Sequence, residues 1–254
     1  MGLIRPPRPS IPFARPMDVV IPASALRILP RTEYTTPPLA PTAVLPCPLA
    51  QFRQWFADAA SPTAPTRVHE PEAMSLSTAS PAGLPAARIV LLKAVDQRGF
   101  TFYTNYTSRK SRELAENPHA ALVFYWREIS RQVRVVGRVE RVAREESEEY
   151  WGTRPVGSRL GAWASRQSSV VGEGEVRERL EKVKERFGEG GQVDDVPLPE
   201  FWGGWRVVPT QVEFWSGQPS RLHDRVRYLR TSPLPSFSSA EEPPVEWKIE
   251  RLAP

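Results

Sequence analysis

The alternation of apolar and polar residues predicts a chain built from short β-strands and tight turns. Segments rich in apolar, aromatic and β-branched residues are separated by Gly, Ser, Asp and Pro, which favour turns. The predicted strands span residues 73–79, 86–94, 100–104, 120–126, 131–142, 205–209, 212–215, 225–230 and 247–252. In 131–142, Val133, Val135 and Val139 occupy one face, whereas Gln132 and Arg134 occupy the other. One apolar and one polar face are typical of an antiparallel sheet or barrel.

Helical periodicity interrupts these strands. Leu49, Phe52, Trp55 and Phe56 recur at helical spacing in the first such segment, so we interpret these aromatic residues as core. The predicted helices span residues 48–60, 109–117, 145–153, 158–165 and 176–187. Strands joined by tight turns and broken by helices predict an α+β fold on a closed antiparallel β-barrel with peripheral helices.

Composition narrows the class of protein. The chain has 254 residues, of which 40% are hydrophobic and 25% charged, as expected of a soluble globular protein. No apolar run reaches the ~20 residues of a membrane helix, so we expect a cytoplasmic protein without a membrane partner. The single cysteine, Cys47, excludes an internal disulfide framework, and three histidines form no metal-ligand spacing.

The two least regular segments lie outside the predicted core. Residues 1–30 are rich in proline and arginine, and we expect them to be disordered. Their arginine content also suggests mitochondrial targeting, although the prolines oppose the amphipathic helix that transit peptides form. Residues 31–254 are then one domain, and the Ser/Pro-rich stretch 231–244 is a flexible insertion.

Charge and motifs exclude several functions. The net charge of +5 suits an anionic ligand, but arginine and glutamate are interspersed and no nucleic-acid motif is present. The sequence lacks GxGxxG after a strand, GxxxxGK[ST] and GxSxG, so Rossmann, P-loop and serine-hydrolase functions are not predicted.

Basic residues cluster around the third predicted strand. Arg88 and Lys93 bracket an apolar run that we interpret as a buried strand, and Gly99 permits the following reversal. Ser108 is a predicted N-cap, which places Arg109 and Lys110 in a first helical turn. Free backbone N–H groups and two cations at a helix start suit a phosphate dianion. On these residues alone, a solvated basic helix end fits equally well.

Nine ordered motifs identify the family that the chain resembles. They are RIVLLK (88–93), FYTN (102–105), SRK (108–110), RQVRV (131–135), RQSS (166–169), FWGG (201–204), EFW (213–215), RLHDR (221–225) and WKIERLAP (247–254). With these motifs, residues 31–254 closely resemble pyridoxine (pyridoxamine) 5′-phosphate oxidases, the flavoenzymes that make pyridoxal 5′-phosphate.

The resemblance implies a fold and a reaction. The fold is an FMN-binding split β-barrel that works as a homodimer, with FMN at the subunit interface. The reaction is oxidation of C4′ of pyridoxamine or pyridoxine 5′-phosphate by hydride transfer to FMN, which O2 then reoxidises with release of H2O2. The amine substrate also releases NH3.

Individual residues are assigned by the same resemblance. The FMN-binding set comprises Arg88, Ile89, Val90, Leu91, Leu92, Lys93, Tyr103, Thr104, Arg109, Lys110, Gln132, Gln167, Ser168, Trp215 and Arg225. The substrate-binding set comprises Lys93, Tyr150, Arg154, Ser158, Arg221, Leu222, His223, Arg31 and Tyr34. Of these, Arg221 and His223 are the predicted catalytic residues. They lie two residues apart on a predicted extended segment, so both side chains are expected to point to one side and Leu222 to the other.

Two alternative functions stay open. A split-barrel flavoprotein that acts on another substrate would bind FMN and ignore vitamin B6 phosphates. A non-enzymatic module that carries a B6 phosphate would need no flavin.

Overall fold

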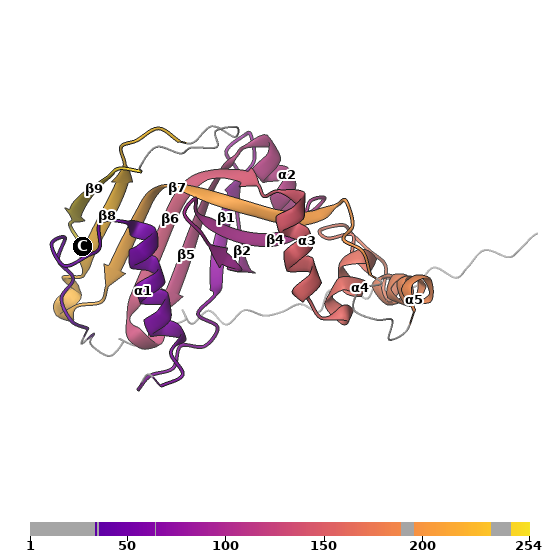
Figure 1. Ribbon diagram of the computed structural model, residues 1–254, viewed down its shortest axis with the longest axis horizontal. Helices are drawn as coiled ribbons and strands as arrows, with labels where there is room; N and C mark the ends of the chain where they lie inside the picture. The colour runs from indigo at the N-terminus through magenta and orange to yellow at the C-terminus, as the bar shows by residue number, and fades with distance from the viewer. Residues whose placement is uncertain (1–33, 35, 64, 189–195, 235–244) are drawn as a thin grey trace, which may run out of the picture. The chain divides into compact units, whose positions relative to one another are not determined.

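The computed structural model describes residues 34, 36–63, 65–188, 196–234 and 245–254 (Figure 1). The predictions for residues 1–30 and Arg31 lie outside this part of the chain, as does most of the predicted insertion. The strands are β1 (Ala73–Ala79), β2 (Pro85–Leu91), β3 (Ala94–Val95), β4 (Phe100–Asn105), β5 (His119–Trp126), β6 (Arg131–Arg141), β7 (Trp202–Ser216), β8 (Asp224–Arg230) and β9 (Trp247–Leu252).

All five predicted helices are present. They are α1 (Pro48–Ala60), α2 (Arg109–Glu116), α3 (Arg144–Thr153), α4 (Val156–Ala164) and α5 (Glu175–Phe187). Ser108 caps α2 as predicted, because its side chain accepts a hydrogen bond from the Ser111 N–H. Gly188 caps α5. Within the described residues, no helix combines the length and apolar character required to cross a membrane.

The strands form one curled antiparallel sheet. Its order is β2-β1-β5-β6-β7-β4-β3, with β8 paired to β7 and β9 to β8. The split-barrel fold is confirmed, although in the described residues the pairing path ends at β2 and β3 without joining them. The barrel is therefore open along the edge where β2 faces β4.

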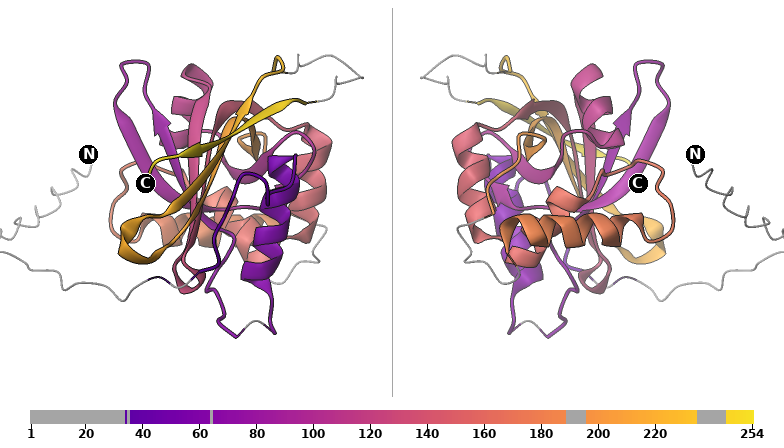
Figure 2. Two further views of the ribbon diagram at one scale, coloured as in Figure 1. Left: turned by 90° about the vertical axis from the view of Figure 1, so that its left-hand side faces the viewer. Right: turned by 90° about the vertical axis from the view of Figure 1, so that its right-hand side faces the viewer.

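The core fills the inside of this curl. The inward positions of β6, including Val133 and Val135, are fully buried, as the alternation predicted. Helix α1 packs Phe52 and Trp55 against the sheet, where Phe52 meets the rings of Phe100 and Phe124. Figure 1 shows α1 against the sheet, whereas α3, α4 and α5 lie at the other end; α5 faces the viewer in the right-hand view of Figure 2.

Strand β7 corrects one prediction. Residues 205–209 and 212–215 belong to a single strand rather than two, because a β-bulge accommodates Pro209. The bulge leaves Thr210 outside the ladder, and its hydroxyl bonds the Val136 carbonyl instead. Gly137 fits opposite because a Cβ there would lie 2.2 Å from the Val208 oxygen.

Strand β2 corrects a second prediction. The run after Arg88 is not a buried strand, because β2 pairs only with β1 and its side chains are exposed or half-buried. Ile89 is 66% exposed and Leu91 38% exposed. These apolar side chains therefore lie on the open edge of the sheet.

Candidate functional site

A cleft of about 660 Å³ opens at the split edge of the barrel. It lies between β2, β4, the start of α2 and the junction of α3 with α4, and its volume is typical of a ligand site. Its lining is Arg88, Ile89, Val90, Leu91, Lys93, Tyr103, Thr104, Lys110, Tyr150, Thr153, Arg154, Pro155, Ser158, Gln167 and Trp202. Twelve of these were predicted; Thr153, Pro155 and Trp202 were not.

The lining is strongly basic. It contains Arg88, Lys93, Lys110 and Arg154, and the described lining residues include no carboxylate. The Lys110 Nζ donates to Gln167 Oε1 over 2.7 Å. Burial lowers the pKa of Lys110, and the positive charge of Arg88 lowers it further. With four basic side chains and no carboxylate among its described lining residues, the cleft suits an anion with several acceptor oxygens.

Arg88 and Arg109 share a carboxylate that the sequence analysis missed. Glu113 is 6% exposed, and it binds Arg109 Nε over 2.8 Å and Arg88 Nη2 over 3.3 Å. Burial favours the neutral acid, but hydrogen bonds from Thr78 and Arg109 and the two arginine charges lower the pKa of Glu113 overall. The i,i+4 spacing of Arg109 and Glu113 was the available signal.

Aromatic rings line the other side of the cleft. Tyr103 stacks on Tyr150 with ring centroids 4.1 Å apart, and Trp202 continues the stack 5.6 Å from Tyr103. The Arg154 guanidinium lies 4.5 Å from the Trp202 ring centroid. Burial, and next the charge of Glu146, raises the pKa of Tyr103 to about 12, so this phenol stays neutral.

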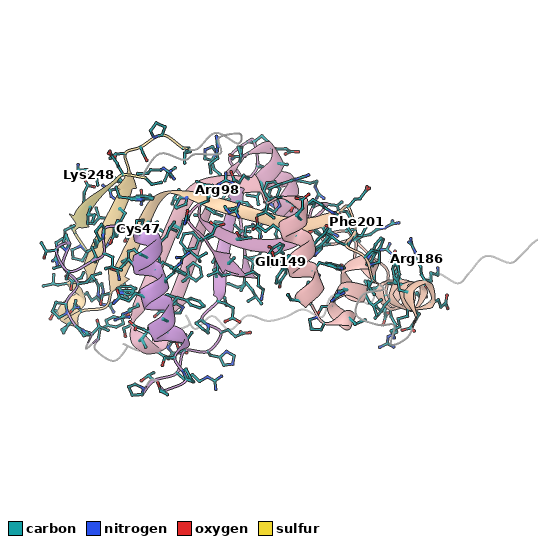
Figure 3. The ribbon with its side chains drawn as sticks, in the orientation of Figure 1. Cys47, Arg98, Glu149, Arg186, Phe201 and Lys248 are labelled. Carbon is teal, nitrogen blue, oxygen red and sulfur yellow. The ribbon has the colours of Figure 1, made fainter. Side chains whose placement is uncertain are left out.

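The polar residues on the aromatic side of the cleft lie at the junction of α3 and α4. Helix α3 ends at Thr153, and Pro155 precedes the first residue of α4, as expected where proline starts a helix. The Arg154 Nη2 donates to the Ser158 carbonyl over 3.1 Å. Figure 3 labels Glu149 on α3 and Phe201 just before β7.

A second cluster forms where β6, β7 and β8 run side by side. Gln132 pairs with Trp215, and Trp215 pairs with Arg225. Arg225 Nε donates over 2.7 Å to Glu213, a 3%-exposed carboxylate that also binds Arg134 over 2.8 Å. Glu213 was not predicted, although it lies in the EFW motif.

Tyr34 and His223 belong to this second cluster. The Tyr34 ring packs edge-on against Trp215 and His223, with centroids 5.6 and 5.3 Å away. The Gln218 backbone N–H donates to His223 Nδ1 over 3.1 Å, so the neutral ring carries its proton on Nε2. Burial, and next the charge of Arg221, lowers the pKa of His223. His223 therefore presents a neutral N–H donor.

The prediction of an extended segment at Arg221 is wrong. Residues Pro219–Arg221 form a 3₁₀ turn, and Ser220 and Arg221 have positive φ angles of 56° and 61°. Pro219 starts this turn because its ring fixes φ. Leu222 is 69% exposed.

The two clusters lie far apart within one chain. Tyr103 pairs with Gly204 near the start of β7, whereas Gln132 pairs with Trp215 near its end. Eleven residues of strand separate Gly204 from Trp215, or roughly 35 Å of extended chain. In Figure 1, β8 and α3 accordingly lie toward opposite ends of the sheet.

The remaining predicted residues lie beside these clusters. Leu92 points into the core, where it is 7% exposed. Ser168, with a φ of 71°, lines a neighbouring cleft that also contains Gln167. The described residues hold no group of three or more His, Cys, Asp or Glu side chains suited to a metal ion.

Comparison with known proteins identifies the family. Residues 61–185 match the family described as pyridoxamine 5′-phosphate oxidase, and residues 202–254 match the pyridoxine 5′-phosphate oxidase C-terminal dimerisation region. A pyridoxine/pyridoxamine 5′-phosphate oxidase of Burkholderia thailandensis is 50% identical over 88% of this chain and 97% of its own. One from Salinibacter ruber is 49% identical over the same shares.

Solved structures agree with this result. The chain resembles PhzG from Burkholderia lata, crystallised with tetrahydrophenazine-1-carboxylic acid, with a TM-score of 0.74 and 28% identity. This match covers 88% of the chain and all of the PhzG chain. An FMN-binding protein from Nostoc punctiforme shares the fold, with a TM-score of 0.60, 17% identity and coverage of 85% and 98%. The chain belongs to the pyridoxine/pyridoxamine 5′-phosphate oxidase family.

Proposed function

We propose that the chain oxidises pyridoxine or pyridoxamine 5′-phosphate to pyridoxal 5′-phosphate, with FMN as cofactor and O2 as electron acceptor. Over the 88% of the chain that aligns, about half of the residues are identical to those of two curated oxidases, and the match covers 97% of each oxidase. The observation that supports the proposal most directly is the basic cleft, which gathers predicted FMN and substrate residues around one space.

The cleft fits FMN in size and chemistry. Its basic end, formed by Arg88, Lys110 and the capped start of α2, suits the FMN phosphate. Thr104 and Gln167 lie beside Lys110 and bond each other over 3.1 Å, so they can exchange this bond for one to the ligand. We assign these residues to the phosphate end of FMN.

A second phosphate fits the opposite side of the cleft. Lys93, Arg154, Tyr150 and Ser158 supply two cations and two hydroxyls. We assign this set to the phosphate of the substrate, as the resemblance implies. A molecule that carries one phosphate then lies between this set and the flavin.

The protein contributes orientation and hydrogen bonds to the reaction. Bound FMN would supply the hydride acceptor for C4′ and the transfer of the electrons to O2, which yields H2O2. We assign to Arg221 a positive charge beside the pyridine ring. His223, whose Nδ1 accepts from the Gln218 N–H, has its Nε2–H available to donate to an acceptor on that ring. The low pKa of His223 keeps it a neutral donor at physiological pH.

The separation of the two clusters supports a site shared by two chains. The family match includes the C-terminal dimerisation region, residues 202–254, which contains Trp215, Arg221 and Arg225. The chain forms a homodimer through this region. We propose that the cleft of one protomer faces the second cluster of its partner, with FMN between them. The exposed apolar face of β2 then becomes buried on assembly.

We also propose that the enzyme acts in the cytoplasm. The soluble substrates, FMN and O2 are available there, and the reaction needs no metal or lipid. Fluorescence imaging of the full chain tests this location, and enrichment in an organelle would contradict it.

Anaerobic spectroscopy tests the proposed function. The FMN-reconstituted protein is mixed with pyridoxine 5′-phosphate without O2, and we expect the flavin absorption band to bleach. Admitting air should restore the band and form H2O2. A band that the substrate leaves unchanged would assign the chain to another split-barrel flavoprotein reaction. Failure to bind FMN would contradict both.

Removing a cation should release FMN. In Arg88→Ala, the phosphate loses a charge-assisted hydrogen-bond donor, so we expect FMN affinity to fall about 20-fold. Equilibrium dialysis measures the change. The Arg177→Ala variant, on the exposed surface of α5, is the control and should bind FMN normally. Normal retention by Arg88→Ala would refute the phosphate assignment.

A further inference from the structure

Glu113 lies behind the basic end of the cleft without lining it. It is buried, and its two carboxylate oxygens bind different partners: Oε1 accepts from Arg109, and Oε2 accepts from Arg88 and from the Thr78 hydroxyl. One carboxylate on α2 thus joins the first helical turn to strand β2.

Arg88 is held from two elements at once. Its Nη1 donates to Thr78 Oγ1 over 2.6 Å and to the carbonyl of Leu76 over 3.2 Å, both on β1. Its Nη2 reaches Glu113 on α2. These bonds leave few alternative orientations for the guanidinium of Arg88, a residue that lines the cleft.

We propose that Glu113 is a positioning residue for the FMN phosphate, acting through Arg88 and Arg109. It fixes both guanidinium groups before the ligand arrives, so that binding does not have to order them. This inference rests on the proposed function. It adds a residue outside the predicted FMN set, together with Thr78 as its hydrogen-bonding partner.

A purely electrostatic role would have the opposite consequence. The Glu113 charge repels the phosphate, so removing that charge alone raises affinity, whereas losing the arginine geometry lowers it. Glu113→Asp separates these effects because it keeps the charge and shortens the side chain by one methylene. The shorter carboxylate cannot keep both arginine contacts and the Thr78 bond at their present lengths.

The test compares FMN with riboflavin, which lacks the phosphate. Apo-protein is titrated with each ligand, and flavin fluorescence reports binding. For Glu113→Asp we expect FMN affinity to fall about fivefold, less than for loss of an arginine, and riboflavin affinity to stay within about twofold. Thr78→Val, nearly isosteric, should show the same selective loss because it also frees Arg88.

Glu140→Asp is the matched control. The Glu140 side chain is 3% exposed and also contacts two arginines, Arg98 over 3.0 Å and Arg206 over 3.5 Å, but it does not line the cleft. The Glu140→Asp variant should keep the wild-type preference for FMN over riboflavin, even if the melting temperature of the protein falls. An unchanged preference in folded Glu113→Asp and Thr78→Val would overturn the inference. A wild-type protein without this preference would instead contradict the proposed FMN site.

Discussion

Arg221→Ala should retain FMN while turnover of pyridoxine 5′-phosphate falls about 100-fold or more. The expectation follows from placement: Arg221 lies outside the cleft that we assign to the cofactor phosphate, and it ends the 3₁₀ turn just before His223. With Arg221 beside the pyridine ring, as we propose, removing its charge would withdraw stabilisation where electron density changes during oxidation of C4′. Stopped-flow measurement of flavin bleaching under anaerobic conditions reports this step directly.

Two further variants define the cause of such a loss. Arg221→Lys keeps the positive charge without the planar guanidinium, so partial recovery would show that charge contributes to the effect. His119→Ala replaces an exposed histidine at the start of β5 and should behave as the wild-type protein, in contrast to His223→Ala. Loss of FMN from Arg221→Ala would contradict the substrate-side assignment.

The regular elements could be predicted because burial of one face makes apolar residues recur at a fixed spacing along the strand or helix. Alternation in β6 fixed which residues face the core, and the resulting prediction for Val133 and Val135 is confirmed. The bulge in β7 could not be predicted, because it depends on the close approach of Gly137 to a strand distant in sequence. A proline in a strand pattern was interpreted as a break.

The site was predicted less completely, because its geometry depends on contacts between elements. Arg88 and Lys110 were assigned to one phosphate, and the cleft contains both. Glu113 was not predicted: its spacing to Arg109 indicates a helical ion pair, but no local pattern indicates its contacts with Thr78 on β1 and Arg88 on β2. The turn at Arg221 was missed for a related reason. Ser220 and Arg221 have positive φ angles, but neither is glycine, the residue type that usually indicates this conformation in a sequence.

A heterodimer of two inactive chains should recover activity. One chain carries Arg88→Ala with Arg154→Ala in the cleft, and the other carries Arg221→Ala in the second cluster. If each site combines the cleft of one protomer with the second cluster of its partner, one of the two sites receives no substitution. Heterodimers purified through two different affinity tags should then have about half the wild-type activity.

The arrangement of the substitutions makes this result specific to a shared site. A site built within one chain would carry a substitution in both protomers, so activity would stay at the level of the parents. A control heterodimer with Arg88→Ala in one chain and Arg154→Ala in the other places a defect in each cleft, and it should recover nothing under either arrangement. Recovery only in the first pairing would therefore show that Arg221 acts at the partner's cleft. Within one chain, by contrast, roughly 35 Å of strand β7 separates the second cluster from the cleft.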